Sequence, residues 1–332
     1  MSAAGSMLAV VFNGPKNISV EQRPIPTIQH EEDIIVKVQM TALCGSELHV
    51  FRGHQPSDTG FIMGHEFTGT VVEKGPGVSS LQIGDRVVTP FTTSCMQCFY
   101  CDKGYSSRCV NNGTSMKAPS TISDKALILM ADIFPTGFFG AKSGFAMLKD
   151  KERSDATVVV IGCGPVGLCA IIAALEYRPK HLFAVDSVDS RLELAKNLGA
   201  EPLNFMTDRA GMEKRIKEVT DGRGADVVIE VVGLSPALRT AYDVVRPFGV
   251  ISSIGVHNAE IPWNGDEAYS KNLRVQMGRC PVRSIFPEAL ALLEKKQDKV
   301  GFMFDRIMPL SDAVEGYALF DQMKVQKVIF TP

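Results

Sequence analysis

The sequence predicts an α/β protein with a β-rich first domain and a second domain built on a doubly wound parallel sheet. Three observations lead to this prediction: the chain length, a glycine turn between an apolar strand and a helix, and the alternation of strand and helix patterns after that turn. A chain of 332 residues exceeds what one hydrophobic core usually serves, so two domains are expected. The composition is that of a globular protein, with 45% apolar and 22% charged residues and a net charge of −2.

The first domain is predicted to be rich in strands. Apolar and β-branched runs separated by turns such as PGV and IGD are typical of short strands. They place strands at residues 8–12, 33–40, 69–74 and 85–90. The first six residues, MSAAGS, are interpreted as an extension that takes no part in the fold.

The segment 158–175 carries no charge and contains the turn GCGPVG at residues 162–167. The β-branched run at 157–161 suits a strand buried on both faces, and the apolar run at 168–175 continues as a helix. Because the glycines interrupt the apolar run near its start, a buried strand, turn and helix are favoured over a membrane span.

This order of strand, glycine turn and helix predicts a dinucleotide site. Gly162 permits the tight turn, Gly164 lets the backbone approach a pyrophosphate, and Gly167 lets the helix pack closely on the strand. Pro165 suits the first helical turn, where its missing N–H would be unpaired anyway. The motif therefore indicates a bound nicotinamide dinucleotide.

A second strand at 181–185 ends in Asp186, whose carboxylate can accept hydrogen bonds from a ribose diol. An acid at this position repels a 2′-phosphate, so NAD is favoured over NADP. The alternative is a strand-end or helix-capping carboxylate that binds no ligand. The residues predicted to bind the cofactor are Gly162, Gly164, Pro165, Val166, Gly167, Asp186 and Arg191.

After this strand the patterns alternate, which argues for a parallel sheet. Helices are predicted at 191–198 and 236–245, with strands at 226–232 and 250–254. These units form a Rossmann-type domain at residues 139–282. The remaining tail is expected to return to the first domain, with a helix at 287–295, a strand at 304–307, a helix at 312–322 and a strand at 327–330.

Four cysteines in the stretch CMQCFYCDKGYSSRC have the spacing of a zinc cage: Cys95, Cys98, Cys101 and Cys109. Cysteines close in sequence present their sulfurs to one metal, and four thiolates leave no open position, so the site should be structural. The alternatives are separate buried thiols, a disulfide pair or a nucleic-acid zinc ribbon. The last needs surplus positive charge that the lobe and the chain lack, so no nucleic-acid partner is expected.

With 8 cysteines, half of them crowded together, and no visible secretory leader, the chain is expected to be reduced and cytoplasmic. No membrane association is expected. A third group of residues lies in the first domain, in CGSELH at 44–49 and GHEFTG at 64–69. A cysteine and a histidine far apart in sequence can meet at a catalytic zinc, although a lone buried histidine is usually only hydrogen-bonded.

Taken together, CGSELH, GHEFTG, the four-cysteine lobe, GCGPVG and DVVIEVVG occur in an order that resembles the zinc-containing medium-chain alcohol dehydrogenases. The resemblance covers nearly the whole chain. It implies a GroES-like catalytic domain at 1–138 and 283–332, with the zinc lobe at 91–112, followed by the NAD-binding Rossmann domain at 139–282. It also implies that Cys44 and His65 bind the catalytic zinc, that Glu66 lies beside the metal, and that Ser46 and His49 relay the proton.

The remaining zinc ligand of the family is commonly a second cysteine ahead of a PTG-like turn, where LMADIFPTG places Asp132. This resembles the glutathione-independent formaldehyde dehydrogenase and dismutase branch. One thiolate and one carboxylate still neutralise Zn²⁺, and an oxygen ligand should leave the metal a stronger Lewis acid. Two alternatives stay open: Asp132 caps the following turn while Glu66 is the third ligand, or the site holds no metal.

With the metal bound, the resemblance implies that zinc lowers the pKa of an alcohol, that Ser46 and His49 carry the proton away, and that hydride passes to the nicotinamide. The unperturbed pKa of a histidine suits the outer end of such a relay. Phe91 resembles a wall of the substrate pocket. The reaction is then that of an NAD-dependent alcohol dehydrogenase of the EC 1.1.1 class, acting on an alcohol or aldehyde.

The chain departs from the family between Cys109 and Asp132, where residues 110–131 are far fewer than usual. Their loss should open the site, expose a sheet edge or leave a partner subunit to cover it. A catalytically weak NAD-binding or structural paralogue with only the structural zinc is therefore the first alternative, and a zinc-free quinone-reductase-like enzyme is the second. The resemblance also suggests a homodimer or homotetramer, with residues 263–273 as possible contacts.

Overall fold

The structure is a computed structural model that describes residues 5–111, 113 and 115–332. The chain divides into two compact units: Met1–Asp132 with Pro281–Pro332, and Ile133–Cys280. The predicted domain boundaries at 138/139 and 282/283 remain a prediction, because compact units need not coincide with functional domains. The four residues at the start of the predicted extension lie outside the described part of the chain.

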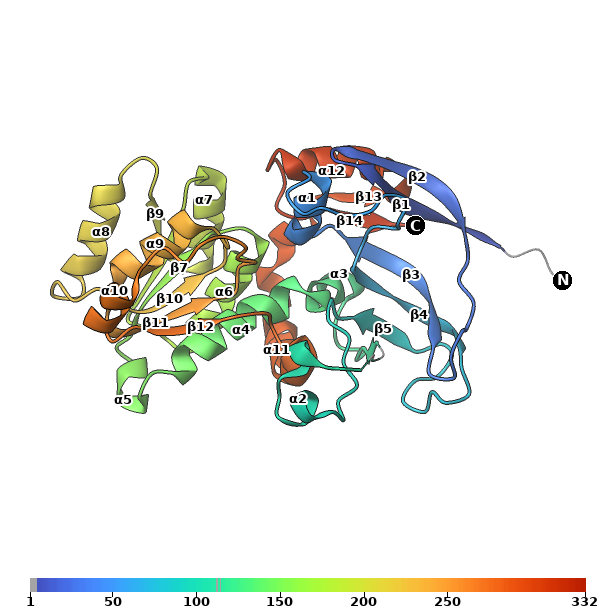
Figure 1. Ribbon diagram of the computed structural model, residues 1–332, viewed down its shortest axis with the longest axis horizontal. Helices are drawn as coiled ribbons and strands as arrows, with labels where there is room; N and C mark the ends of the chain where they lie inside the picture. Colours follow the sequence, from blue (N-terminus) through green and yellow to red (C-terminus); the bar gives the residue numbers. More distant parts are fainter. Residues whose placement is uncertain (1–4, 112, 114) are drawn as a thin grey trace. The chain divides into compact units, whose positions relative to one another are not determined.

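The first unit is built on a hairpin and a six-stranded sheet with the strand order β13-β14-β3-β4-β5-β6 (Figure 1). The hairpin strands are β1 (Ser6–Gly14) and β2 (Asn17–Pro24), and the sheet strands are β3 (Ile34–Ala42), β4 (Glu66–Lys74), β5 (Arg86–Thr89), β6 (Met116–Lys117), β13 (Ile307–Pro309) and β14 (Ile329–Thr331). β14 pairs antiparallel with β3, so the tail does return to the first unit as predicted.

Helices of the first unit connect these strands. They are α1 (Gly45–Phe51), α2 (Phe99–Asp102), α3 (Asp124–Leu127), α11 (Val282–Lys296) and α12 (Ala313–Asp321), with short 3₁₀ turns at Ser106–Arg108, Ile128–Ala131, Gln297–Lys299, Gly301–Phe304 and Leu310–Asp312. One hydrophobic cluster joins Phe12 of β1, Leu48 and Phe51 of α1, and Tyr317 of α12. The C-terminal helix therefore shares a core with the helix that follows β3.

The second unit is a six-stranded, fully parallel sheet with the order β12-β11-β10-β7-β8-β9. Its strands are β7 (Thr157–Ile161), β8 (His181–Asp186), β9 (Glu201–Asn204), β10 (Ala225–Glu230), β11 (Val245–Ser253) and β12 (Arg274–Met277). The strand order reverses between β7 and β10, as in a doubly wound dinucleotide-binding sheet. The predicted fold class is confirmed.

Helices cover both faces of this sheet. They are α4 (Ile133–Ala146), α5 (Asp150–Arg153), α6 (Pro165–Leu175), α7 (Asp189–Leu198), α8 (Arg209–Glu218), α9 (Ser235–Val244) and α10 (Gly265–Ser270). Ile216 of α8 and Leu238 of α9 share a core cluster with Val159 and Val228. α4 lies on the opposite face, where Cβ atoms added at Gly140 and Gly144 would meet Ile229 and Val227.

Two predicted elements of the tail, a helix and a strand, have different bounds in the structure. The helix expected at 287–295 begins at Val282, because Val282, Ile285 and Phe286 are buried and sustain a turn ahead of Pro287. A strand was expected at 304–307, but Phe304 ends a 3₁₀ turn and β13 starts only at Ile307. A short apolar run does not by itself distinguish a strand from a buried turn.

The last strand was expected at 327–330, but it starts at Ile329 and leaves Lys327 ahead of it. The elements β2, β9, β12, α4 and α8 were not predicted from the sequence. Among the described helices, none is long and apolar enough to cross a membrane.

The short segment after Cys109 folds against the edge of the first sheet. β6 pairs with β5 over two residues, Met116 and Lys117. The Arg86 guanidinium then donates to the Asp124 carboxylate at 2.6 Å, to the Ile122 carbonyl at 2.8 Å and to the Pro119 carbonyl. This part of the sheet edge is therefore covered by the chain's own residues.

Hydrogen bonds tie the same segment to α11 and to Gln297, the residue that follows it. Thr121 hydrogen-bonds to Glu294, and the Ser123 N–H donates to the Gln297 side chain at 3.1 Å. Residues 112 and 114 of the shortened segment lie outside the described residues.

Candidate functional site

Three loops of the first unit bring a cysteine, a histidine and two acids to one place. Cys44 follows β3 and caps α1, His65 and Glu66 lie at the start of β4, and Asp132 follows the 3₁₀ turn Ile128–Ala131. Strands β3 and β4 pair antiparallel, with Ala42 opposite Glu66, so the end of one strand lies beside the beginning of the next. Ligand atoms of all four side chains lie within 4.8 Å of one another.

The spacing of these donors fits a tetrahedral zinc. The Asp132 Oδ2 atom lies 3.3 Å from the Cys44 Sγ atom and 3.7 Å from the His65 Nε2 atom. With ligand bonds of about 2.0 to 2.3 Å, donors of a tetrahedral zinc lie roughly 3.4 to 3.6 Å apart. The Asp132 side chain is 12% exposed and that of His65 is 29% exposed, so one side of the group is open to a further ligand.

The electrostatics of the group also favour a cation. Burial, followed by the charges of Asp132 and Glu66, raises the pKa of the Cys44 thiol well above its usual range. Burial alone would lower the pKa of His65, but its hydrogen bond to Asp132 and the charges of nearby acids raise this pKa to about 9. A bound Zn²⁺ would remove this excess of negative charge and release the protons that the donors otherwise hold. The residues present therefore fit the metal.

Glu66 is held by a lysine that the sequence analysis did not single out. Lys327 Nζ donates to both carboxylate oxygens of Glu66, at 2.8 and 2.6 Å, and the two side chains are 1% and 0% exposed. Although burial lowers the pKa of Lys327, the charges of Glu66 and Cys44 raise it above the ordinary value, so the ammonium is retained. The only signal in the sequence is that a charged residue, Lys327, lies beside the apolar run VIF. Both were predicted to lie in the strand at 327–330.

The predicted relay residues both lie on α1. The Ser46 hydroxyl donates to the Cys44 Sγ atom at 3.2 Å. The imidazole of His49 stands 6.2 Å from that of His54, centroid to centroid. Burial, together with the charges of His54 and Arg52, lowers the pKa of His49. Among the described residues no direct hydrogen bond joins Ser46 to His49. Proton transfer from the hydroxyl to the imidazole therefore needs a bridging group.

Helix α1 is fixed at both ends. The backbone N–H of Cys44 donates to the buried Glu47 carboxylate at 2.9 Å, and the Tyr317 hydroxyl reaches the same carboxylate at 3.4 Å. At the other end Arg52 donates to Asp321 at 2.7 Å. Because Glu47, Tyr317 and Asp321 hold the helix that carries Cys44, Ser46 and His49, this helix has little freedom to shift. Phe91, the predicted pocket wall, has its ring 6.5 Å from the imidazole of His65.

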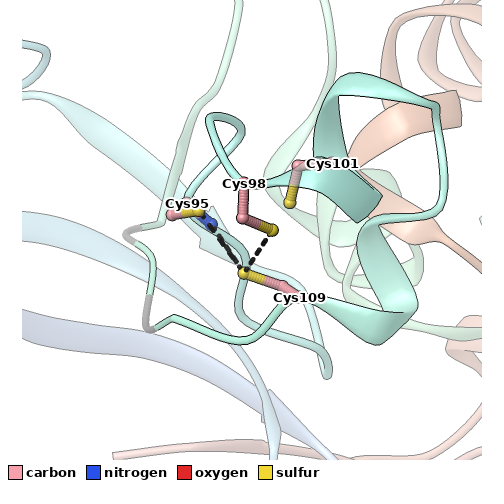
Figure 2. Close-up of side chains that lie close together, drawn as sticks. All are labelled: Cys95, Cys98, Cys101 and Cys109. Atoms are coloured by element: carbon pink, nitrogen blue, oxygen red, sulfur yellow. Dashed lines mark hydrogen bonds between the residues drawn. The ribbon is translucent and has the colours of Figure 1, made fainter.

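The four lobe cysteines point toward one another (Figure 2). The Cys109 sulfur lies 3.6 Å from that of Cys95 and 3.9 Å from that of Cys98. A tetrahedral zinc with Zn–S bonds of about 2.3 Å holds its sulfurs roughly 3.8 Å apart. None of the eight cysteines, all of which lie in the described part of the chain, forms a disulfide, so the alternative of a disulfide pair is not realised in the structure.

Backbone N–H groups point at these sulfurs. The N–H groups of Gln97 and then Cys98 help to lower the pKa of Cys95 to about 6, and those of Cys101 and Val110 lower the pKa of Cys98. Burial raises the pKa of Cys101 to about 12. The backbone thus stabilises two thiolates even without a metal, which is the chemistry expected of a zinc lobe.

The glycine turn of the second unit has the predicted geometry. Gly162 adopts φ +93°, and a Cβ at Gly167 would lie 1.8 Å from the Gly162 carbonyl oxygen, so both positions require glycine. Gly164 caps α6 and Pro165 is its first residue. A Cβ at Gly164 would meet no protein atom within 4 Å. Internal packing therefore does not explain this glycine, whereas a closely bound ligand would.

Asp186 ends β8 but is already engaged with the backbone. Its carboxylate accepts the N–H groups of Cys163 at 2.6 Å, Ser187 at 2.7 Å and Val188 at 2.9 Å. The Arg191 guanidinium lies 4.0 Å away, and the Nε atom of Arg191 is buried without a hydrogen-bond partner. Asp186 thus shapes the glycine turn directly, in addition to the ribose contact that the sequence predicts.

Comparison with known proteins gives consistent matches. A family model described as Alcohol dehydrogenase GroES-like domain matches residues 30–136, and one described as Zinc-binding dehydrogenase matches residues 165–295. Zinc-type alcohol dehydrogenase B of Aspergillus flavus is 61% identical over 99% of this chain and 82% of its own length. The chain belongs to the zinc-type alcohol dehydrogenase family.

Two further relatives agree with this membership. The structure of alcohol dehydrogenase TADH from Thermus sp. ATN1 superposes with a TM-score of 0.88 at 32% identity, covering 98% of this chain and 99% of that one. Formaldehyde dismutase of Pseudomonas putida is 27% identical over 98% of this chain and 97% of its own length. As a zinc-type alcohol dehydrogenase, this protein is a zinc-dependent oxidoreductase with zinc and NAD as its cofactors, as predicted.

This alcohol dehydrogenase is shorter than its relatives within the aligned region. The alignment with the Aspergillus relative runs over 352 positions and that with the dismutase over 397, whereas this chain has 332 residues. These two relatives therefore contain residues that have no counterpart here, and their placement in segment 110–131 stays a prediction.

Proposed function

We propose that this alcohol dehydrogenase holds a catalytic zinc through Cys44, His65 and Asp132 and a structural zinc through the four lobe cysteines. The observation that carries the first assignment is the placement of the Asp132 carboxylate next to both Cys44 and His65. The second rests on sulfur separations of 3.6 and 3.9 Å.

The Lys327 contact favours Asp132 over Glu66 as the third ligand. Both oxygens of Glu66 accept hydrogen bonds from the Lys327 ammonium, and breaking a buried ion pair is costly. The Asp132 carboxylate instead faces Cys44 and His65. We therefore assign Glu66 to the surroundings of the metal, where its charge is balanced by Lys327.

Zinc bound at this group supplies a Lewis acid that lowers the pKa of an alcohol hydroxyl. The protein residues then have two tasks. Ser46, hydrogen-bonded to Cys44, stands where it can accept the substrate proton, and His49, whose pKa is lowered mainly by burial, is neutral near pH 7 and can receive it. The turn at Gly162, Gly164 and Gly167, with Val166 and Pro165 at the start of α6, is proposed to hold the NAD pyrophosphate.

The substrate is proposed to be a small-molecule alcohol or aldehyde. The shortened segment is tied back to Arg86 and α11, and the partly exposed His65 leaves the metal group open to a ligand.

The proposal is tested by following NAD reduction with a panel of primary and secondary alcohols, using the zinc-loaded protein. Asp132→Ala is expected to lose activity by at least about a hundredfold, since zinc ligands are essential to the Lewis acid. The matched control is Asp102→Ala, an exposed acid of the lobe, which should keep it. Wild-type protein that binds only the lobe zinc, oxidises no alcohol and reduces no aldehyde would support the weak paralogue instead.

We also propose that the protein forms a homodimer or homotetramer in the cytoplasm. β12 stands at the edge of the parallel sheet, and an uncovered edge strand offers N–H and C=O groups to a second copy. Eight cysteines that form no disulfide in the described structure suit a reducing compartment. Light scattering that finds only monomers would overturn the proposal of an oligomer.

A further inference from the structure

The first turn of α11 contacts both arms of the four-cysteine lobe. The Arg283 guanidinium donates through Nη1 to the carbonyl of Ser94 at 3.1 Å, immediately before Cys95. One residue along, Ser284 and Ser106 exchange two hydrogen bonds: the Ser106 N–H donates to the Ser284 hydroxyl at 3.3 Å, and the Ser284 N–H donates to the Ser106 hydroxyl at 3.1 Å. Ser106 lies between Cys101 and Cys109, so residues from the tail hold both halves of the lobe.

Arg283 also has an electrostatic relation to the cage. Four thiolates exceed the charge of one Zn²⁺ by two, so a filled lobe is an anion that benefits from a nearby cation. Burial lowers the pKa of Arg283, whereas the charges of Cys101, Cys95 and Cys109 act in the opposite direction. A guanidinium stays charged under these conditions. It therefore brings a fixed positive charge to the buried side of the lobe.

The lobe's own cations are placed differently. Lys103 forms an ion pair with Asp102 at 2.9 Å, and its side chain is 57% exposed. Arg108 is exposed as well. Charges in contact with water are screened and contribute little, whereas a half-buried charge is screened much less.

We propose that Arg283 is a positioning residue of the lobe's metal site, which holds the Ser94 carbonyl and offsets the surplus negative charge of the four thiolates, and so slows the release of zinc. The inference rests on the proposed structural zinc. It means that retention of this metal depends on a residue that lies almost two hundred positions away in the sequence, in the tail that returns to the first unit. The cysteine spacing alone does not indicate this dependence.

The test measures how fast zinc passes from the lobe to a chromogenic chelator. Asp132→Ala protein is used as the background, so that only lobe zinc is expected, and its zinc content is measured first. Arg283→Ala, Arg283→Gln and Arg283→Lys are compared in this background, with Lys103→Gln as the control that removes an exposed lobe cation. Arg283→Gln keeps a donor for the Ser94 carbonyl but loses the charge, so it separates the two roles.

Arg283→Ala and Arg283→Gln are expected to release zinc about tenfold faster or more, as is usual when a partner surrounding a metal site is lost. Arg283→Lys should recover most of the difference, and Lys103→Gln should stay within about twofold of the background. Added salt should accelerate release from the background protein more than from Arg283→Gln, because screening weakens the charge of Arg283 only where it is present.

Release from Arg283→Gln at the background rate would overturn the charge role, and release from Arg283→Ala at that rate would overturn the inference as a whole. If Arg283→Ala does not fold, the Gln and Lys variants still decide the question. A background protein that contains no lobe zinc contradicts the proposed structural site itself. That failure is recognised before any Arg283 variant is measured.

Discussion

At the scale of single residues, the buried pair of Glu66 and Lys327 distinguishes the two acids of the proposed catalytic zinc site. Both oxygens of Glu66 face the ammonium, which leaves Asp132 as the acid that approaches Cys44 and His65. A buried charge is tolerated only when it is paired. The pair thus keeps a second carboxylate close to the metal group without adding a further unbalanced charge.

Lys327→Met should be strongly destabilising, because it leaves the Glu66 carboxylate buried and uncompensated. We expect a loss of about 3 to 5 kcal/mol in the free energy of unfolding, measured by urea denaturation of the full chain. The double variant Glu66→Gln with Lys327→Met should recover part of that loss. A loss below about 1 kcal/mol would show that water reaches the pair in solution.

The pH dependence of alcohol oxidation should report His49. Burial lowers its pKa below the ordinary value of about 6.5, so the imidazole is neutral and able to accept a proton above that lowered value. The rate should therefore fall as the pH drops through the pKa of His49, and His49→Gln should lower the rate about tenfold to a hundredfold and remove this acidic limb. In His54→Gln, the control, the acidic limb should persist but move to higher pH, because the charge of His54 lowers the pKa of His49. A limb that persists in His49→Gln would place the proton acceptor elsewhere.

At the scale of elements, the glycine turn between β7 and α6 contains two glycines that the fold requires and one, Gly164, that is proposed to serve a ligand. Gly162 is fixed by its positive φ and Gly167 by contact with the Gly162 carbonyl, whereas Gly164 faces open space. The sequence motif names all three without ranking them. The structure shows which of them the protein needs even without cofactor.

Gly164→Ala and Gly167→Ala form a matched pair for this distinction. Gly164→Ala should fold with an almost unchanged melting temperature but bind NADH at least about tenfold more weakly, because its methyl group occupies the space left for the pyrophosphate. Gly167→Ala should lower the melting temperature, since its methyl group would overlap the Gly162 carbonyl. Fluorescence titration with NADH and thermal unfolding measure the two effects. Unchanged NADH binding by Gly164→Ala would contradict the proposed cofactor contact.

Elements with strong local patterns were the ones that the sequence predicted well. β7, the glycine turn and α6 follow from a β-branched run and spaced glycines, and the lobe follows from the spacing of Cys95, Cys98, Cys101 and Cys109. The start of α11 was missed because a proline such as Pro287 is typical of the first turn of a helix. Packing of Val282 and Phe286 extends the helix ahead of it. β12 and β9 were missed because short strands at a sheet edge carry little apolar pattern of their own.

At the scale of the whole molecule, the contacts that the sequence could not supply are those between distant segments. Lys327 meets Glu66, Arg283 meets Ser94, and Asp321 meets Arg52, each joining the tail to the first part of the chain. Motifs in a single sequence name ligand types at short spacing, but they do not name partners more than a hundred residues away. The tail thus supports both proposed metal centres, although it provides no ligand to either.

The central claim is that the chain binds two zinc ions at separate sites, and elemental analysis of purified protein tests it most directly. We predict two zinc ions per chain in the wild type, one in Asp132→Ala and one in Cys98→Ser, because each substitution removes a ligand from a different centre. Two ions that fall to one in both variants would establish separate sites. One ion in the wild type, unchanged in Asp132→Ala and lost in Cys98→Ser, would contradict the catalytic centre and leave only the lobe filled.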